Sequence, residues 1–76
     1  MDDSGFTFTD SAFKHGIKKD VSLGIIASPF LSKRKKGSDV ILVFGFDDSG
    51  QAIEVLYDAV RRVVFHAMPV NVLKMR

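Results

Sequence analysis

Cysteine is absent from the 76 residues of this chain. Its absence excludes disulfide bonds, thiolate nucleophiles and zinc sites with cysteine ligands, although it does not identify a compartment. No run of residues approaches the ~18 apolar residues of a membrane-spanning helix. The first five residues lack the basic region and the apolar region of a signal peptide. We therefore expect a cytoplasmic protein that does not associate with membranes.

Several motifs with well-defined chemistry are also missing. The two histidines lie far apart in the sequence and form no His-x-x-x-His pair, which argues against a metal site. The glycines occur singly among predicted turns and form no phosphate-binding loop. No serine lies in a nucleophile elbow. We therefore expect neither a metal ion nor a cofactor.

The charge is unevenly distributed along the chain. The formal net charge is +2, but residues 1–10 contain three aspartates and no basic residue. The remainder therefore holds 11 basic and 6 acidic residues, which suits a nucleic-acid partner. A chain of this length buries roughly 60% of its unfolded surface, so we expect one domain over residues 1–76 with a modest core. Residues 1–5 are expected to form a flexible tail.

The stretch Asp39–Phe46, DVILVFGF, is apolar at both alternating sets of positions. A strand without a polar face is typically covered on both sides. The run is short and rich in β-branched and aromatic residues, and the turn sequence Asp47–Gly50 follows it. It is therefore predicted to be a central strand.

Local patterns predict the other elements. In chain order we expect an extended lead-in at residues 6–9, helices at about 11–15 and 18–27, and strands at 30–36, 39–46, 52–58 and 62–68. The lysine-rich first strand is expected to lie at the sheet edge. The predicted fold is an α+β domain in which two N-terminal helices pack on a four-stranded antiparallel β-meander.

Finer features of this fold also follow from the pattern. Gly24 is expected to allow close packing of the second helix on the sheet. In the last strand, strict alternation places Val63, Phe65 and Ala67 on one face and Val64, His66 and Met68 on the other. In the basic tail from Asn71 to Arg76, Val72 and Leu73 are expected to pack back on the domain.

Four short motifs occur in a recognisable order. They are Lys14-His15-Gly16, Ser28-Pro29, Gly45 with Asp48-Ser49-Gly50, and Glu54-Val55-Leu56-Tyr57. With two helices preceding a meander, this order resembles the BrnT family of bacterial toxins, within the broader RelE/ParE-like group. The resemblance covers roughly Phe8 to Met68. It implies a type II toxin that cleaves RNA, arrests translation and is neutralised by a cognate antitoxin protein. Its expected partners are RNA, the ribosome and that antitoxin, and the assembly is expected to be a homodimer or a hetero-oligomer with the antitoxin.

One departure from the family is evident in the last strand. Members of the family usually end this strand with a polar residue, a small residue and an arginine that contributes to activity. The corresponding stretch here, Phe65–Pro69, contains no arginine. Either His66 has a related role or this copy is inactive.

Metal-free RNA cleavage requires a base, an acid and cations that stabilise the charged transition state. Histidine suits proton transfer near neutral pH, and lysine or arginine suits phosphate binding. The candidate catalytic residues are His15, His66 and Lys14. The candidate RNA-binding residues are Lys33, Arg34, Lys35, Arg61 and Arg62.

Each candidate also has a structural alternative. His66 could be a hydrogen-bonded structural residue, and His15 could interact with a helix dipole. Lys33–Lys36 could be a solvated edge. The sequence thus leaves open a ribonuclease toxin, a non-catalytic partner-binding module or inactive homologue, and a toxin that acts on a protein target such as DNA gyrase.

Overall fold

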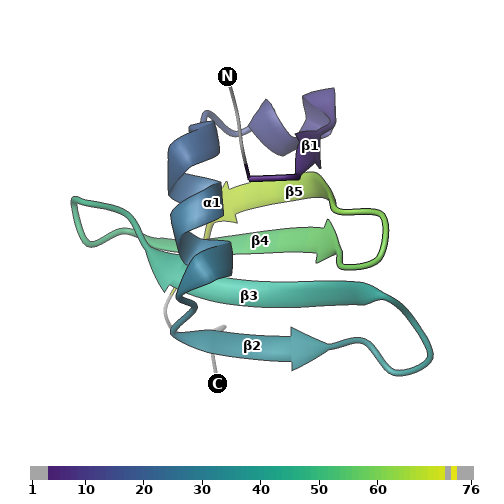
Figure 1. Cartoon of the computed structure of the whole chain (residues 1–76). Helices are drawn as coiled ribbons and strands as arrows, with labels where there is room; N and C mark the ends of the chain where they lie inside the picture. The colour runs from purple at the N-terminus through teal and green to yellow at the C-terminus, as the bar shows by residue number, and fades with distance from the viewer. Residues whose placement is uncertain (1–3, 72, 74–76) are drawn as a thin grey trace.

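The computed structural model describes residues 4–71 and residue 73. The elements, in chain order, are β1 (Thr7–Phe8), the 3₁₀ helix η1 (Asp10–Phe13), α1 (Lys19–Ala27), β2 (Leu31–Arg34), β3 (Val40–Phe46), β4 (Ala52–Asp58) and β5 (Val63–Pro69). The strands form a five-stranded sheet in the order β1-β5-β4-β3-β2 (Figure 1). β1 is parallel to β5, and the other neighbours are antiparallel.

The sheet packs against α1 on one face, here called the helix side. Asp20 in the first turn of α1 interacts favourably with the helix dipole, and the helix ends at Ser28 because the following Pro29 disfavours helical geometry there. Ile25 of α1 is buried against Val43 and Val55 of the sheet. This cluster is the main core of the protein.

The opposite face of the sheet, here called the far face, has a second, smaller cluster. Phe44, Ala52 and Val70 are buried there, and Leu31, Leu42 and Met68 pack against them. Adjacent residues of β3 are thus buried on opposite faces, Val43 at 1% and Phe44 at 3% exposure. The prediction of a central strand covered on both sides is therefore confirmed over Val43–Gly45, whereas Phe46 is exposed.

The predicted arrangement of two helices on a four-stranded antiparallel meander is wrong. The first predicted helix is the single turn η1, whose backbone hydrogen bonds, such as Ala12 N–H to Thr9 O at 3.0 Å, join residues three apart. A five-residue segment does not overcome the cost of α-helix nucleation. The predicted lead-in is a fifth strand, β1, which pairs with β5 and makes the sheet mixed.

The close approach of α1 to the sheet depends on Gly45 and not on Gly24. A Cβ atom built on Gly45 would lie 2.8 Å from Ile25 Cγ1, whereas one on Gly24 would have nothing within 4 Å. The glycine needed for packing is therefore on the strand, beneath the helix. The prediction that Gly24 has this role is wrong.

The terminal predictions are only partly covered by the described residues. Residues 1–3 and Val72 lie outside them, and Leu73 is 62% exposed, so it does not pack back on the domain. Ser4, within the predicted tail, accepts a hydrogen bond of 2.9 Å at its backbone oxygen from Arg62 Nη2. This contact links the start of the described chain to the loop before β5.

Candidate functional site

The position of His66 depends on an irregularity in β5. The register between β4 and β5 shifts between Leu56 and Tyr57, so that Leu56 is opposite His66 while Tyr57 is opposite Val64. Phe65 is the extra residue, which is the arrangement of a β-bulge. Val64 and Ala67 are both fully buried in the helix-side core. The strict alternation predicted for this strand is therefore wrong, and the bulge directs His66 to the far face.

On the far face, His66 has a carboxylate partner. Its Nε2 lies 2.8 Å from Oε2 of Glu54, on the neighbouring strand β4. The two side chains remain 25% and 16% exposed, respectively. Because a carboxylate on one ring nitrogen orients the imidazole and selects its tautomer, the pair leaves Nδ1 of His66 as the nitrogen for other chemistry.

His15 reaches the same place from η1. The Ser11 hydroxyl donates a 2.7 Å hydrogen bond to the backbone oxygen of Phe65, at the bulge. Ala12 is buried in the core, so η1 is held on β5 at two points. The turn after η1 then brings the His15 ring to 6.0 Å from the His66 ring, between centroids, with an interplanar angle of 73°.

Two histidines that are 51 positions apart in the sequence are therefore adjacent in space, beside one carboxylate. We call His15, His66 and Glu54 the histidine cluster. Sequence reasoning identified both histidines but did not include Glu54 among the site residues. The available signal was a single acidic residue interrupting an apolar strand face, since Glu54 is flanked along β4 by Ala52 and Leu56 on that face.

Two of the predicted basic residues accompany the cluster. Lys14 is exposed and precedes His15 directly. Lys33 shares the far face with His66, because it is opposite Leu42, Leu42 is opposite Leu56, and Leu56 is opposite His66. Three strand spacings separate Lys33 from His66, about 14 Å between backbones.

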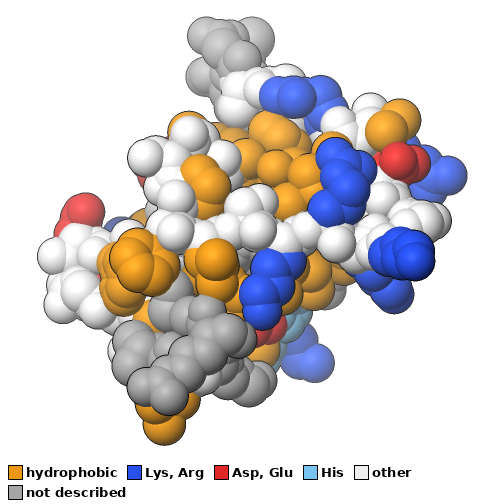
Figure 2. All heavy atoms as spheres, turned by 90° about the horizontal axis from the view of Figure 1, so that it is seen from below, with side chains coloured by type: hydrophobic (Ala, Val, Ile, Leu, Met, Phe, Trp, Pro, Cys, Tyr) orange, Lys and Arg blue, Asp and Glu red, His pale blue; other side chains and the backbone are white. Residues whose placement is uncertain are grey.

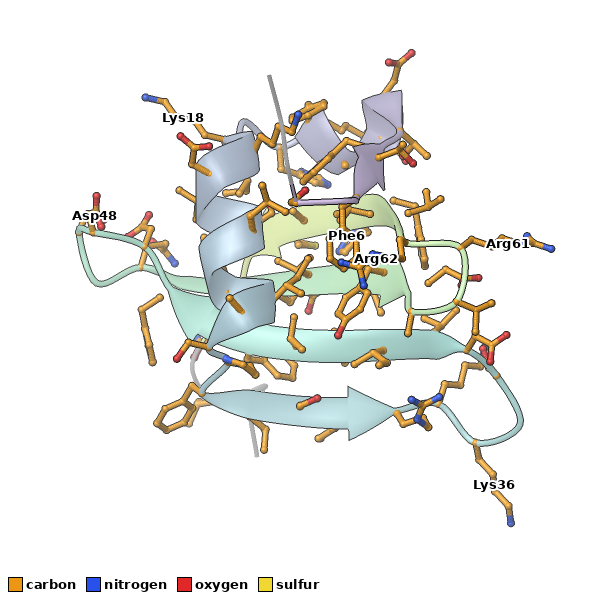
Figure 3. All side chains as sticks on the ribbon, viewed as in Figure 1. Phe6, Lys18, Lys36, Asp48, Arg61 and Arg62 are labelled. Atoms are coloured by element: carbon orange, nitrogen blue, oxygen red, sulfur yellow. The ribbon has the colours of Figure 1, made fainter. Side chains whose placement is uncertain are left out.

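The other predicted RNA-binding residues are placed differently. Arg34 is on the helix side, opposite Ile41, and Lys35 follows the end of β2. Arg61 points into solvent from the β4–β5 loop (Figure 3). Arg62 packs its guanidinium 4.1 Å from the centre of the Phe6 ring, on the helix side. The predicted basic set is therefore divided between both faces and one end of the sheet.

Arg62 also adopts an uncommon backbone conformation, with φ at 58°. Its N–H donates to Asp58 O at 2.8 Å, and its own backbone oxygen accepts from Thr7 N–H at 2.9 Å. The side chain and backbone of Arg62 thus connect β1 to the β4–β5 loop. These contacts assign Arg62 a structural role in the described structure.

Within residues 4–71 and 73, no group of three or more histidine, aspartate or glutamate side chains is arranged to hold a metal ion. No helix of the described chain is long and apolar enough to cross a membrane. Comparison with known proteins found no match among family models, curated proteins or solved structures. The site must therefore be interpreted from its own geometry.

Proposed function

We propose that this protein cleaves RNA by metal-independent acid–base chemistry at the histidine cluster, as the toxin of a type II toxin–antitoxin system. The observation that carries the proposal is the 6.0 Å separation of the His15 and His66 rings, together with the 2.8 Å contact between His66 and Glu54. The fold expected from the BrnT resemblance is not the one observed. The proposal therefore rests on this cluster and not on the architecture.

In the proposed reaction, His66 is the general base and His15 the general acid. Glu54 holds Nε2 of His66, so that Nδ1 accepts the proton of a ribose 2′-hydroxyl, and the carboxylate stabilises the imidazolium that forms. The 2′-oxygen bonds to phosphorus as the bond to the 5′-oxygen breaks, and His15 protonates the departing 5′-oxygen. The products are a 2′,3′-cyclic phosphate and a 5′-hydroxyl.

The charge that accumulates on the phosphate oxygens requires nearby cations. Lys14, which directly precedes His15 and is exposed, is the side chain proposed for this role. Lys33 shares the far face, where it would contact a neighbouring phosphate of an extended RNA. The exposure of His15 and the partial exposure of His66 suit a polymer that lies across the surface.

Cell-free translation and RNA sequencing gels test the proposal. Purified wild-type protein, separated from any antitoxin, should inhibit translation and cut RNA in the presence of ribosomes. Its cleavage of isolated RNA should be the same with and without EDTA. His66→Ala and His15→Ala should each lower cleavage by about 10²-fold or more, since proton transfer by one positioned side chain typically contributes that much. The new ends should carry 5′-hydroxyl groups.

Glu54→Gln is the most informative variant, because it keeps a hydrogen-bonding group but removes the charge. We expect a smaller loss than for His66→Ala, and thermal unfolding should show that each variant is folded. Ser32→Ala, exposed on β2 at the opposite edge of the sheet from β5, is the surface control and should behave as wild type. Cleavage that persists in both histidine variants, or ends that carry 5′-phosphates, would contradict the mechanism.

A non-catalytic partner-binding module is the second candidate. It is favoured by the absence of arginine from Phe65–Pro69. It is also favoured by the His66–Glu54 contact, because a hydrogen bond to the mostly buried Glu54 carboxylate would explain the position of His66 without any catalytic role. In that case purified protein would leave RNA and translation unchanged. His66→Ala would then lower only the stability. Inhibition without cut RNA would instead indicate a protein target.

A further inference from the structure

An apolar groove lies on the helix side, on the opposite face of the sheet from the histidine cluster. Its volume is about 540 Å³. The lining residues come from α1, from the loop before β1, and from β4 and the loop that follows it. They are Ser4, Phe6, Leu23, Ile26, Ala27, Tyr57, Ala59 and Arg62. No residue of the proposed catalytic site belongs to this set.

One wall of the groove is a flank of α1 that the sheet does not cover. Ser22 and Ile25 are the buried residues of the helix, whereas Leu23 and Ile26 are only partly buried and Ala27 is exposed. α1 crosses one half of the sheet, and among residues 4–71 and 73 no second α-helix covers the other half of this face (Figure 1). Leu23 and Ile26, three residues apart on α1, therefore face the groove beside the helix.

The rim of the groove is positively charged. Arg62 lines it directly. Arg34 is on the same face, since it is opposite Ile41, and Ile41 is opposite Tyr57. Two strand spacings, about 10 Å, separate the backbones of Arg34 and Tyr57. Figure 2, which is seen from below Figure 1 and so toward the β2 edge, shows hydrophobic side chains gathered between blue Lys and Arg side chains.

Asp58, the carboxylate of β4 nearest the groove, does not neutralise this positive charge. The Asp58 Oδ1 atom accepts hydrogen bonds from the backbone N–H groups of Val60 and Arg61, at 2.9 and 2.8 Å. Its position in the β4 register, opposite Val40, places it on the far face. The groove thus combines an apolar floor with Arg62 at its edge, and Arg34 lies on the same face of the sheet, two strands from Tyr57.

We propose that this groove binds an acidic amphipathic helix of a partner protein, lying beside α1. Such a helix would place apolar side chains against Leu23, Ile26 and Tyr57 and carboxylates near Arg34 and Arg62. Helices pack at 8–10 Å between axes, so a second helix next to α1 would complete the layer that covers the sheet. This inference depends on the groove and its charge, and not on RNA cleavage.

Other occupants fit the groove less well. A second copy of this chain would bring its own Arg34 and Arg62 toward the same rim if the two grooves faced each other, and α1 has only one acidic residue, Asp20. RNA phosphates could contact the arginines, but the Arg62 guanidinium already covers the Phe6 ring. The α1 wall of Leu23, Ile26 and Ala27 offers RNA neither a stacking surface nor a hydrogen-bonding side chain. An acidic, amphipathic protein helix offers apolar side chains to the floor of the groove and carboxylates to the arginines.

Selection from a displayed library of random 16-residue peptides tests the proposal on the full chain. We expect the enriched peptides to have apolar residues at helical spacing together with several Asp or Glu residues. NMR spectra recorded with a synthetic copy should show shifts at Leu23, Ile26, Tyr57 and Ala59. Selected peptides that lack acidic residues, or that shift residues elsewhere, would overturn the proposal.

Two variants separate the contributions of charge and shape. Arg34→Glu reverses an exposed rim charge and should weaken peptide binding at least tenfold at low salt. Ala27→Gln extends an exposed helical side chain over the groove and should also weaken binding at least tenfold. Asp48→Lys changes a charge at the other end of the sheet and should leave binding unchanged. Equal peptide binding by the wild type and all three variants would overturn the proposal.

Two further outcomes identify other occupants. If a chain lacking residues 1–3 binds the peptide at least tenfold more tightly, the acidic N-terminal residues of the protein itself compete for the groove. The proposal that a partner's helix is the occupant would then be wrong. If sedimentation shows a dimer that Ala27→Gln dissociates, a second copy is the occupant. RNA cleavage measured with saturating peptide should continue, because the histidine cluster is on the far face. Absence of cleavage both with and without peptide would count against the proposed function and not against the groove.

Discussion

At the residue scale, Gly45 and Ile25 determine how closely α1 approaches the sheet. A Cβ atom at position 45 would lie 2.8 Å from Ile25 Cγ1 and 2.9 Å from Ile25 Cγ2. Because such contacts are too short, Gly45→Ala must displace the helix or the isoleucine. We expect the free energy of unfolding to fall by about 1–3 kcal/mol, as in other overpacked cores. Urea unfolding measures it.

Gly24→Ala is the matched control for this prediction. Gly24 is in α1, and an added Cβ atom would have no neighbour within 4 Å. Alanine is favoured over glycine in a helix by about 1 kcal/mol, so this variant should be more stable than wild type by up to that amount. If both variants lost stability equally, the packing of α1 would not depend on the strand glycine.

Ser22 is the buried polar residue for which the described residues provide no partner. Its side chain is 1% exposed, and its Oγ atom has no hydrogen bond within the described structure. Ser22→Ala should raise the stability by about 1 kcal/mol, because it removes a desolvated hydroxyl. About 0.5 kcal/mol of any gain reflects the higher helix propensity of alanine, so the measured gain must exceed that value. A loss of stability would show that the hydroxyl is satisfied in solution.

At the element scale, the contact between η1 and β5 determines whether the two histidines meet. The Ser11 hydroxyl bonds Phe65 O at 2.7 Å and Thr9 Oγ1 at 2.8 Å. Ser11→Ala removes the only side-chain hydrogen bond described between η1 and β5, within residues 4–71 and 73. We expect the stability to fall by about 1 kcal/mol, the usual worth of one such bond. NMR should show weaker ring–ring cross-peaks between His15 and His66.

Ser32→Ala is the control for that experiment, because Ser32 is exposed on β2, the strand at the other edge of the sheet. It should leave the cross-peaks unchanged. If Ser11→Ala also leaves them unchanged, the burial of Ala12 alone positions the turn that carries His15. The cleavage rate of the variant should follow the cross-peaks rather than the stability.

The β3–β4 loop is predicted to contribute to acid sensitivity. The Ser49 hydroxyl and then the Gln51 N–H hold the pKa of Asp47 below its ordinary value of 3.8, through hydrogen bonds of 2.7 and 2.9 Å to Oδ1. Because the pKa is lowered on folding, this contribution is present above the unfolded value and is lost as the pH falls through the folded value. Acid therefore weakens the loop.

Asp47→Asn should consequently be less stable than wild type at neutral pH, and the difference should disappear as the pH falls from 3.8 through the lowered pKa of Asp47 in the folded protein. Denaturant unfolding at several pH values measures this. Asp48→Asn removes a neighbouring charge without touching these hydrogen bonds, so its stability at neutral pH should remain close to that of wild type. A difference for Asp47→Asn that is independent of pH would contradict the assignment.

At the scale of the whole molecule, the antiparallel strands separate the loops into two ends. The β2–β3 and β4–β5 loops lie at one end and are joined by the hydrogen bond from Ala59 N–H to Asp39 O, at 2.9 Å. Figure 3 shows Lys36 and Arg61 pointing into solvent at this end, and Asp48 at the other. The sheet topology thus gathers basic residues that are 25 positions apart.

If RNA extends from the histidine cluster over this basic end, its binding must depend on salt. The catalytically impaired His66→Ala protein should bind RNA with a logarithmic salt slope that becomes shallower by about 2 when Lys35, Lys36 and Arg61 are all changed to Gln. This value follows from about 0.7 per phosphate contact for a single strand. An unchanged slope in fluorescence titrations would place the RNA elsewhere on the surface.

Local sequence patterns were sufficient for much of this fold. α1 and the three strands β3, β4 and β5 occur within a few residues of their predicted bounds, because apolar periodicity and the flanking Gly, Pro and Asp residues act over short distances. The edge position of β2 is also confirmed. His15 and His66 could be selected as candidates from residue chemistry alone.

Features that depend on contacts between distant segments could not be read from these patterns. The pairing of Thr7 with Val63 makes the sheet mixed, and the bulge at Phe65 reverses the predicted facing of the residues before it. The β4–β5 register places His66 beside Glu54, and the contact between η1 and β5 brings His15 to His66. Each of these contacts is selected by burial and by backbone hydrogen bonding in the folded chain, whereas local propensity is the same whether or not the segments meet.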